Sequence, residues 1–189
     1  MKYLVSTGRM HGFESLEERR LLMVLDFVTG GVTEVLAQPF RLDFTWRDGT
    51  GRHIPDFLAL VAGGVLLLDV RPAHLIKEDD AVKFAATAQA AAAVGWRYVV
   101  VSGWRRQVVT VIDALSARRR PLSDPLALQA LMSDLVAERP RLLVELVDEA
   151  PFPAVARVHL LHLLWHRRLA VDLTQPLGDG SWIYPVGSG

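Results

Sequence analysis

Two acidic residues lie at the ends of two apolar runs that follow each other along the chain. Asp56 stands at the start of the first run, and Asp69 closes a second run that begins at Gly64. Residues 61–64 (Val-Ala-Gly-Gly) join the two runs, and a glycine pair can supply the positive φ angles that a tight turn requires. The sequence therefore predicts a β-hairpin that places Asp56, near the start of one strand, beside Asp69, near the end of the next.

Two carboxylates at one end of a sheet favour a divalent cation between them. Like charges at short range raise each other's pKa unless a cation separates them, and Mg²⁺ and Mn²⁺ prefer oxygen ligands. Pro55-Asp56 followed by Asp69-x-Arg71 has the spacing of the PD…(D/E)-x-K signature of metal-dependent nucleases, with arginine in place of lysine. A purely structural interpretation stays open, in which Asp56 caps a turn and Asp69 pairs with Arg71 or Arg52.

The composition is that of a globular protein without an overall electrostatic preference. Of the 189 residues, 51% are hydrophobic and 22% are charged, and the formal net charge is zero. Contacts with nucleic acid must therefore come from a local patch. The absence of cysteine excludes disulfides and thiolate metal sites. We find no apolar run of membrane-spanning length and no signal peptide, so we expect a cytoplasmic protein without membrane contact.

The first twelve residues are polar and contain glycine, which predicts a mobile arm. Arg9 and His11 could touch a phosphate from such an arm, although a disordered terminus is the favoured interpretation.

A helix is expected from Glu14 onward, and it offers a third carboxylate. Ser15 and Glu18 have the spacing of a capping box, and Gly30-Gly31 is expected to end the helix. Glu18 has two interpretations that spacing alone does not separate. It either caps the helix or faces the two aspartates as a metal ligand.

The rest of the first 120 residues predicts an α/β domain with a mixed sheet flanked by helices. The strand expected at 96–102 has an uninterrupted apolar centre, which suggests that both of its faces are buried. The basic end of the final helix, residues 118–120, is either solvated or a phosphate-contacting patch. The expected elements are strands at 32–36, 41–46 and 96–102, a hairpin turn at Asp48-Gly49, an alanine-rich helix at 79–94 and a helix at 104–120.

A proline-rich linker at residues 121–125 predicts a second, smaller domain over residues 121–189. Its helices are expected at 126–137, 141–149 and 153–166, followed by strands at 169–173 and 181–185 around a turn at 178–180. Helices followed by a two-stranded ribbon is the order of a winged helix, a fold that binds DNA or proteins. His159, His162 and His166 have a spacing that can bind metal, but surface or satisfied core positions are favoured for them.

Several segments, taken in order over residues 13–102, resemble the TnsA-like endonuclease subunits of heteromeric transposases. The segments are 13–19 (FESLEER), 25–27 (LDF), 38–40 (QPF), 53–57 (HIPDF), 69–72 (DVRP), 83–84 (KF) and 95–98 (GWRY). The resemblance implies a restriction-endonuclease-like fold followed by a winged-helix-like domain. It also implies a DNA endonuclease that cuts the 5′ ends of a transposon. The implied partners are double-stranded DNA, a DDE-type transposase subunit that cuts and joins the 3′ ends, and an AAA+ regulator that contacts the C-terminal domain.

Position by position, the resemblance assigns the catalytic residues to Glu18, Asp56, Asp69 and Arg71. The first three would hold Mg²⁺ or Mn²⁺, and Gln38 of the QPF turn would be structural. Arginine can stabilise developing charge but cannot act as a base, because it stays protonated. Either Arg71 supplies only the charge, or Lys77 or Lys83 reaches the site, or the subunit is weak by itself.

Two other functions stay open at this point. The chain could be a catalytically weak or inactive nuclease-fold subunit that acts as a scaffold for DNA or a partner, or it could be a stand-alone defence nuclease.

Overall fold

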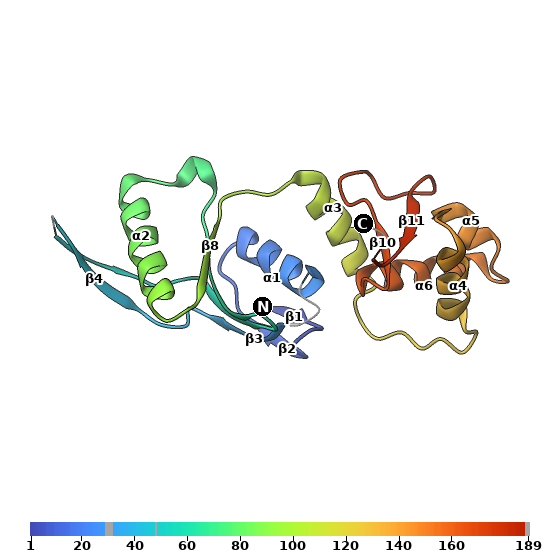
Figure 1. Ribbon diagram of the computed structural model, residues 1–189, viewed down its shortest axis with the longest axis horizontal. Helices are drawn as coiled ribbons and strands as arrows, with labels where there is room; N and C mark the ends of the chain where they lie inside the picture. Colours follow the sequence, from blue (N-terminus) through green and yellow to red (C-terminus); the bar gives the residue numbers. More distant parts are fainter. Residues whose placement is uncertain (29–31, 48, 188–189) are drawn as a thin grey trace. The chain divides into compact units, whose positions relative to one another are not determined.

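The computed structural model describes residues 1–28, 32–47 and 49–187, and the chain forms two compact units, Met1–Trp104 and Arg105–Gly189. The first unit is built on a four-stranded sheet with the order β3-β6-β7-β8 (Figure 1). Its strands are β3 (Val32–Ala37), β6 (Phe57–Val61), β7 (Gly64–Val70) and β8 (Arg97–Val101). The first three strands are antiparallel and β8 runs parallel to β7. The mixed sheet expected from the sequence is confirmed.

The predicted hairpin is the pair β6 and β7. Phe57 lies opposite Leu68 and Val61 opposite Gly64, which has a φ angle of +118°. Only glycine adopts such an angle without strain, so Gly64 fixes the turn and with it the register of both strands.

Helices cover both faces of this sheet. Helix α1 (Leu16–Val28) packs Leu22 and Leu25 onto Phe57 and Leu68. Helix α2 (Glu78–Ala93) packs Ala91 onto Leu58 and Leu67 on the other face. Neighbouring residues of β6 and β7 thus point to opposite faces and are buried on both, which explains the continuous apolar runs of this hairpin. Strand β8 has no buried residue and its Val99 is 44% exposed, so the burial on both faces expected for this strand is wrong. A short 3-10 helix, η1 (Ala73–Leu75), lies between β7 and α2. The predicted helix end at Gly30-Gly31 lies outside the described residues.

The N-terminal residues form a hairpin, so the prediction of a mobile arm is wrong. Strand β1 (Lys2–Leu4) pairs with β2 (Arg9–His11), and Leu4 is completely buried in the core of the first unit. The carboxylate of Asp26 in α1 accepts hydrogen bonds from the backbone N–H groups that follow Leu4, at 3.1 and 2.9 Å.

Arg9 and His11 also have structural partners here. Arg9 forms an ion pair with Glu34. His11 is 6% exposed, and its Nδ1 lies 3.0 Å from the carbonyl oxygen of Val35. The hairpin is tied down by contacts with residues more than twenty positions away, which local composition does not reveal.

The segment that connects β3 to β6 along the chain forms a second hairpin. Strands β4 (Leu42–Trp46) and β5 (Gly49–His53) form a separate two-stranded sheet, with Leu42 opposite His53 and Trp46 opposite Gly49 (Figure 1). The rings of Phe44 and Trp46 stack obliquely, with their centroids 5.7 Å apart. A Cβ at Gly51 would lie 2.9 Å from atoms of both rings, so a side chain there would displace the rings. Of the predicted Asp48-Gly49 turn, Asp48 lies outside the described residues.

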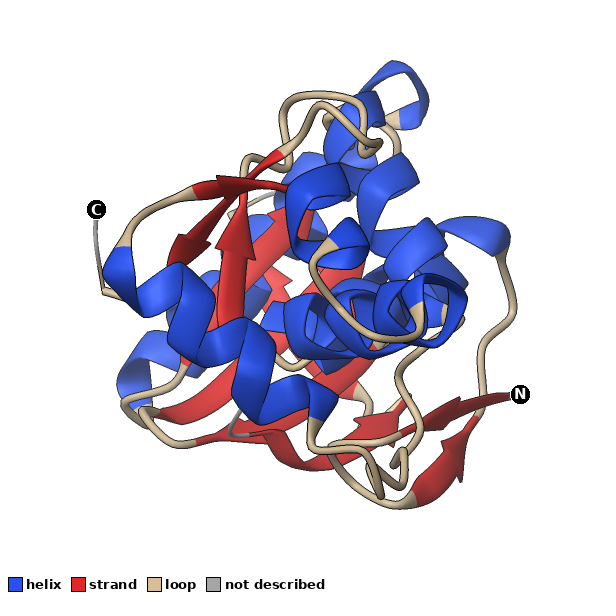
Figure 2. Cartoon of the chain, turned by 90° about the vertical axis from the view of Figure 1, so that its right-hand side faces the viewer, coloured by secondary structure: helices blue, strands red, loops and turns tan. Residues whose placement is uncertain are grey.

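The second unit consists of helices around a three-stranded antiparallel sheet with the order β10-β11-β9 (Figure 2). Its helix α6 is buried along most of its length and contacts three other helices, α3, α4 and α5. The elements are α3 (Arg106–Ser116), α4 (Leu128–Glu138), β9 (Arg141–Leu142), α5 (Leu143–Asp148), α6 (Pro153–Trp165), β10 (Leu169–Val171) and β11 (Trp182–Pro185).

The boundary between the units lies earlier than the predicted division after residue 120. Helix α3 belongs to the second unit, where the Arg118 carbonyl that follows it lies 2.9 Å from Nδ1 of His162 in α6. The linker signal at Pro121 marks a loop inside the second unit. His159 and His162 are buried at 3% and 6% exposure, and His159 contacts Gln129 at 3.2 Å.

Within the described ranges, no helix is both long and apolar enough to cross a membrane.

Candidate functional site

Asp56 and Asp69 lie side by side at one end of the β6–β7 hairpin. The backbone N–H of Asp56 donates to Oδ1 of Asp69 at 3.2 Å, and the N–H of Val70 donates to Oδ2 of Asp56 at 2.7 Å. Each carboxylate thus accepts a hydrogen bond from the strand that carries the other. The juxtaposition expected from the glycine turn and the strand lengths is confirmed.

The backbone around Asp56 is held from both sides. Pro55 is buried and ends the segment that follows β5. The N–H of Gln38 donates to the carbonyl of Asp56 at 2.9 Å, and Gln38 has a left-handed φ angle of 49°. Gln38 therefore has the structural role expected for the QPF turn.

Asp69 is the most enclosed carboxylate of the site, with 3% exposure. Its Oδ2 lies 2.8 Å from Nε2 of His53 and also accepts a hydrogen bond from the hydroxyl of Tyr98. His53 is the last residue of β5, and Tyr98 lies in β8. Three donors from three strands or strand ends therefore converge on one carboxylate.

Burial, and then the hydrogen bond and charge of Asp69, raise the pKa of Tyr98 above its usual value. The phenol therefore stays protonated and donates to Asp69 at every ordinary pH.

Asp56 titrates abnormally. Burial and then the negative charges of Asp69 and Glu18 raise its pKa to about 6, although the hydrogen bond from Val70 and the nearby His53 act to lower it. The site is therefore a cluster of negative charge in a partly dry environment, which a bound cation would stabilise.

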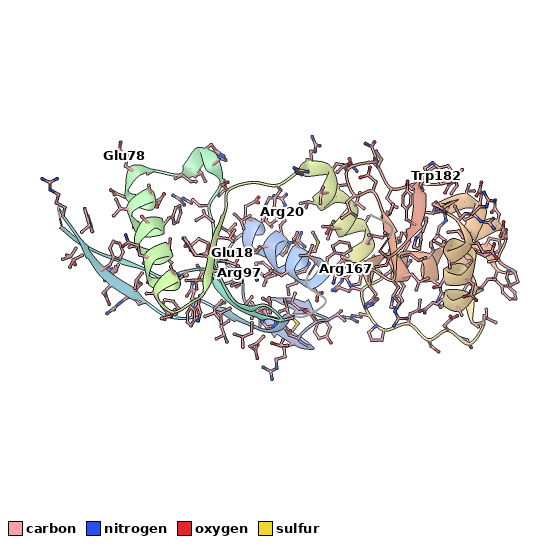
Figure 3. All side chains as sticks on the ribbon, viewed as in Figure 1. Glu18, Arg20, Glu78, Arg97, Arg167 and Trp182 are labelled. Atoms are coloured by element: carbon pink, nitrogen blue, oxygen red, sulfur yellow. The ribbon has the colours of Figure 1, made fainter. Side chains whose placement is uncertain are left out.

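Glu18 lies on helix α1 (Figure 3). It is near enough to Asp56 to affect the pKa of that residue, yet its carboxylate also caps α1. Oε1 accepts from the Ser15 hydroxyl at 2.8 Å, Oε2 accepts from the Glu14 N–H at 2.9 Å, and the Glu18 N–H donates to the Ser15 hydroxyl at 3.1 Å. The capping box is confirmed. In the described part of the chain, no three His, Asp or Glu side chains are gathered as a preformed metal group.

Arg71 points to a different partner. Its Nε lies 3.3 Å from Oδ2 of Asp80, near the N-terminus of α2. Asp80 also accepts from the Lys77 N–H at 3.1 Å and pairs with Lys83 at 3.8 Å. The side chains of Arg71 and Lys83 thus both lie beside Asp80, while Lys77 contacts Asp80 through its backbone N–H. Among the described residues, the contacts of Asp69 include neither Arg71 nor Arg52.

Two residues of the site were not predicted as such. In the sequence, His53 stands out only as part of the HIPDF segment, and Tyr98 only as part of the GWRY segment and of the strand expected at 96–102. A histidine three positions before Asp56 was a usable signal for the first. The position of Tyr98 follows from the pairing of Leu67 with it across β7 and β8, which sequence alone does not give.

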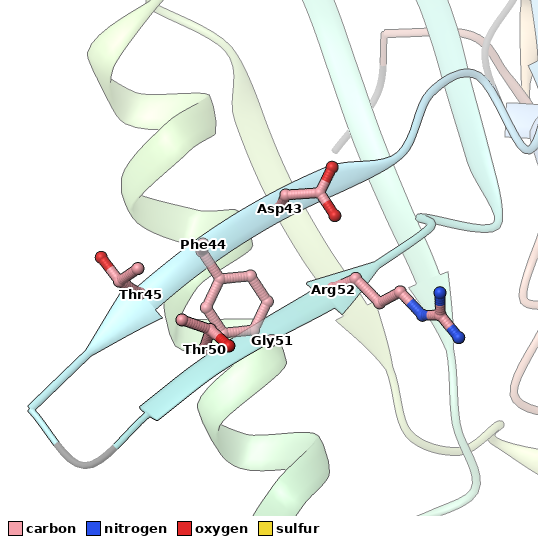
Figure 4. A pocket seen from close by; sticks show the side chains of 6 residues that line it. All are labelled: Asp43, Phe44, Thr45, Thr50, Gly51 and Arg52. Carbon is pink, nitrogen blue, oxygen red and sulfur yellow. The ribbon is translucent and has the colours of Figure 1, made fainter.

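Described residues of the first unit line a hollow on the β4–β5 hairpin and another near the base of that hairpin. One, of about 560 Å³, is on the β4–β5 hairpin, and none of the three carboxylates lines it (Figure 4). The other, of about 290 Å³, is apolar and lies between the base of that hairpin and α2. The first is lined by Asp43, Phe44, Thr45, Thr50, Gly51 and Arg52.

The chain matches none of the protein-family models searched and shows no significant match to a curated protein.

Proposed function

We propose that the chain is a divalent-metal-dependent DNA endonuclease, acting as the subunit of a heteromeric transposase that cuts the 5′ ends of the transposon. The order helix, three antiparallel strands, crossover helix and parallel strand is that expected for a restriction-endonuclease-like domain. The Asp56–Asp69 pair carries the proposal, because these two aspartates of the signature meet at the end of the hairpin.

The donor chemistry suits Mg²⁺ or Mn²⁺. Each ionised carboxylate has about four acceptor positions. One of these is used on Asp56, two on Glu18 and three on Asp69. Positions therefore remain on all three, and hard cations such as Mg²⁺ prefer oxygen ligands of this kind. To serve as the third metal ligand, the Glu18 carboxylate would have to leave its capping hydrogen bonds with Glu14 and Ser15.

The residues of the site would have distinct roles. Asp56, Asp69 and Glu18 would hold the cation, which when bound supplies an activated water and positive charge beside the phosphate. His53 and Tyr98 fix the orientation of Asp69. Arg71 lies beside Asp80, near the start of α2.

The second unit fits partner binding in this proposal. Its order of two helices, a short strand, two helices and an antiparallel strand pair supports a winged-helix-like domain. Helix α6, which would enter the DNA groove in such a domain, is mostly buried. Trp182 and Tyr184 on β11 are 48% and 37% exposed, and we propose this face for the AAA+ regulator (Figure 3). Double-stranded DNA and a DDE-type transposase subunit are the other proposed partners.

The test is cleavage of DNA by the full chain with Mg²⁺ or Mn²⁺, alone and together with the candidate transposase subunit. The wild type is compared with Asp56→Ala and with Asp134→Asn, which changes an exposed carboxylate of the second unit. Cleavage by the wild type and by Asp134→Asn, but not by Asp56→Ala, supports the proposal. Equal cleavage by all three refutes it.

A scaffold subunit without catalytic activity is the second candidate. It is favoured by the capping contacts of Glu18 and by the ion pair of Arg71 with Asp80. Crystals soaked in Mn²⁺ separate the two candidates, since the scaffold predicts no metal density between Asp56 and Asp69. A stand-alone defence nuclease would share the site, and neighbouring genes for a transposase and an ATPase would argue against it.

A further inference from the structure

Two arginine-rich segments of the second unit lie next to each other, although they are far apart along the chain. Residues 118–120 (Arg-Arg-Arg) come shortly after α3, and residues 167–168 (Arg-Arg) come shortly after α6. The carbonyl oxygen of Arg118 lies 2.9 Å from Nδ1 of His162, and the His162 ring packs against that of His166 with centroids 4.3 Å apart. His166 directly precedes the second segment, so these contacts bring both segments to the C-terminal end of α6. We call the five arginines the arginine patch (Arg167 is labelled in Figure 3).

The arginine patch is accessible to a partner. Arg119 is half-buried, and the other four arginines are exposed. Among the described residues, no ion pair with a carboxylate includes Arg118, Arg119, Arg167 or Arg168. Their positive charges are therefore available to a negatively charged ligand.

Asp124 is a carboxylate close to the patch, but it has other partners. Its Oδ1 and Oδ2 accept hydrogen bonds from the N–H groups of Leu128 and Gln129 at the start of α4, at 2.9 and 2.8 Å. The side chain of Gln129 in turn lies 3.4 Å from Nη1 of Arg168. Asp124 carries a single negative charge, so it can offset only one of the positive charges of the patch.

The ends of the two helices explain only part of this arrangement. A cation is favourable near a helix C-terminus, and Nη1 of Arg119 donates to the carbonyl oxygen of Ser116 at 2.8 Å. That hydrogen bond uses one arginine of the five. The remaining like charges repel one another, and a bound polyanion would remove this repulsion.

We propose that the arginine patch binds the phosphate backbone of double-stranded DNA. A guanidinium stays charged and matches two phosphate oxygens at once, which suits arginine to this ligand. The patch consists of arginine alone, without the apolar side chains that enter a lipid surface or the aromatic rings that stack on single-stranded bases. The choice of DNA among polyanions rests on the proposed endonuclease function.

Contacts of this kind would hold DNA without reading its sequence. Phosphate contacts position a protein on the duplex, whereas base edges in the grooves carry the sequence information. Helix α6 is mostly buried, so the patch offers the DNA backbone a surface beside this helix and does not need α6 to enter a groove. We therefore expect the second unit to strengthen DNA binding equally for any sequence.

The test compares two variants of the full chain that each remove three positive charges from the second unit. The patch variant combines Arg118→Ala, Arg168→Ala and Arg167→Asn, because asparagine tolerates the left-handed φ angle of 52° at that position.

The control variant combines three arginines that lie at the opposite ends of α3, α4 and α6 from the patch. They are replaced as Arg106→Ala, Arg139→Ala and Arg157→Ala. Circular dichroism checks that both variants are folded.

The assay is fluorescence anisotropy of a short labelled duplex of arbitrary sequence, in EDTA, over a series of KCl concentrations. Each phosphate contact contributes about 0.9 to the slope of log affinity against log salt. We expect the patch variant to lose about 2–3 of this slope and at least about tenfold in affinity at ~100 mM salt. The control variant is expected to keep the slope and affinity of the wild type.

A patch variant that binds the duplex with the affinity and salt slope of the wild type overturns the inference. An equal loss in both variants also overturns it, because net charge alone would then account for binding. Anionic phospholipid vesicles are tested in parallel, and a wild type that binds them but not the duplex overturns the choice of DNA.

The outcome is separate from that of the proposed endonuclease function, because EDTA excludes cleavage from the binding assay. A duplex that binds through the patch but is never cut with Mg²⁺ or Mn²⁺ refutes the endonuclease function and supports the inference. Cleavage that is lost in Asp56→Ala, together with unchanged binding by the patch variant, overturns the inference and leaves the endonuclease function standing.

Discussion

Replacing Asp56 by asparagine should remove activity and yet stabilise the first unit at neutral pH. The pKa of Asp56 is raised from 3.8 to about 6, mainly by burial and then by neighbouring negative charge. At about 1.4 kcal/mol per pKa unit this corresponds to ~3 kcal/mol, which solvent screening of a partly exposed group reduces to about 1–2 kcal/mol. Asparagine keeps an acceptor for the Val70 N–H and carries no charge.

The sign follows from linkage. The folded state holds the Asp56 proton more tightly than the unfolded state, so the free energy of unfolding falls as pH rises from about 4 to 6. In Asp56→Asn the free energy of unfolding does not fall in this way, because asparagine has no proton to lose in this pH range. The variant should therefore gain about 1–2 kcal/mol at pH 7.5 and almost nothing at pH 4, where Asp56 is neutral in the folded wild type.

Amide hydrogen exchange in β6 and β7 is the suitable assay, because it reports on the first unit separately from the second. Wild type and Asp56→Asn are compared at pH 4.5 and 7.5 after correction for the intrinsic pH dependence of exchange. A variant less stable than the wild type at pH 7.5, or an equal difference at both pH values, would refute the reasoning.

Two further changes test other parts of the structure. Leu4→Ala should lower the free energy of unfolding of the first unit by about 2–5 kcal/mol in a urea titration, because it opens a cavity in the core. No measurable loss would mean that the N-terminal residues are not packed and would support the mobile arm predicted from the sequence. Gly51→Val should displace the rings of Phe44 and Trp46, so the near-ultraviolet circular dichroism of these aromatic residues should change. An unchanged spectrum would show that the hairpin accommodates a side chain there.

The parts of the fold that could be predicted from the sequence are those set by neighbouring residues. The Gly63-Gly64 turn and the strand lengths after it were enough to bring Asp56 beside Asp69. The Ser15–Glu18 spacing was enough to predict a capping box. Such signals act within a few positions of the chain, so a single sequence contains them.

The remaining features depend on contacts between distant segments. The N-terminal hairpin looked mobile because its anchors, Asp26 and Val35, lie far along the chain. Tyr98 reaches Asp69 only through the parallel pairing of β8 with β7. The position of α3 in the second unit likewise depends on its packing against α6, which the linker signal at Pro121 could not reveal.

The direction of Arg71 was the hardest feature to predict. The alternation of side chains along a strand suggested that Arg71 would share a face with Asp69. Strand β7 ends at Val70, however, and Arg71 lies beyond it, where Asp80 at the start of α2 attracts the guanidinium. Alternation indicates the face of the sheet, here the one that α2 covers, but not which acidic residue near that face, Asp69 or Asp80, the guanidinium contacts.

The central claim is that Asp56 and Asp69 together bind a divalent cation, and calorimetric titration of the full chain with Mn²⁺ tests it most directly. The account predicts saturable binding to the wild type and to Asp134→Asn, and loss of that binding in both Asp56→Asn and Asp69→Asn. Binding that persists in the two site variants, or no binding to the wild type, would contradict it.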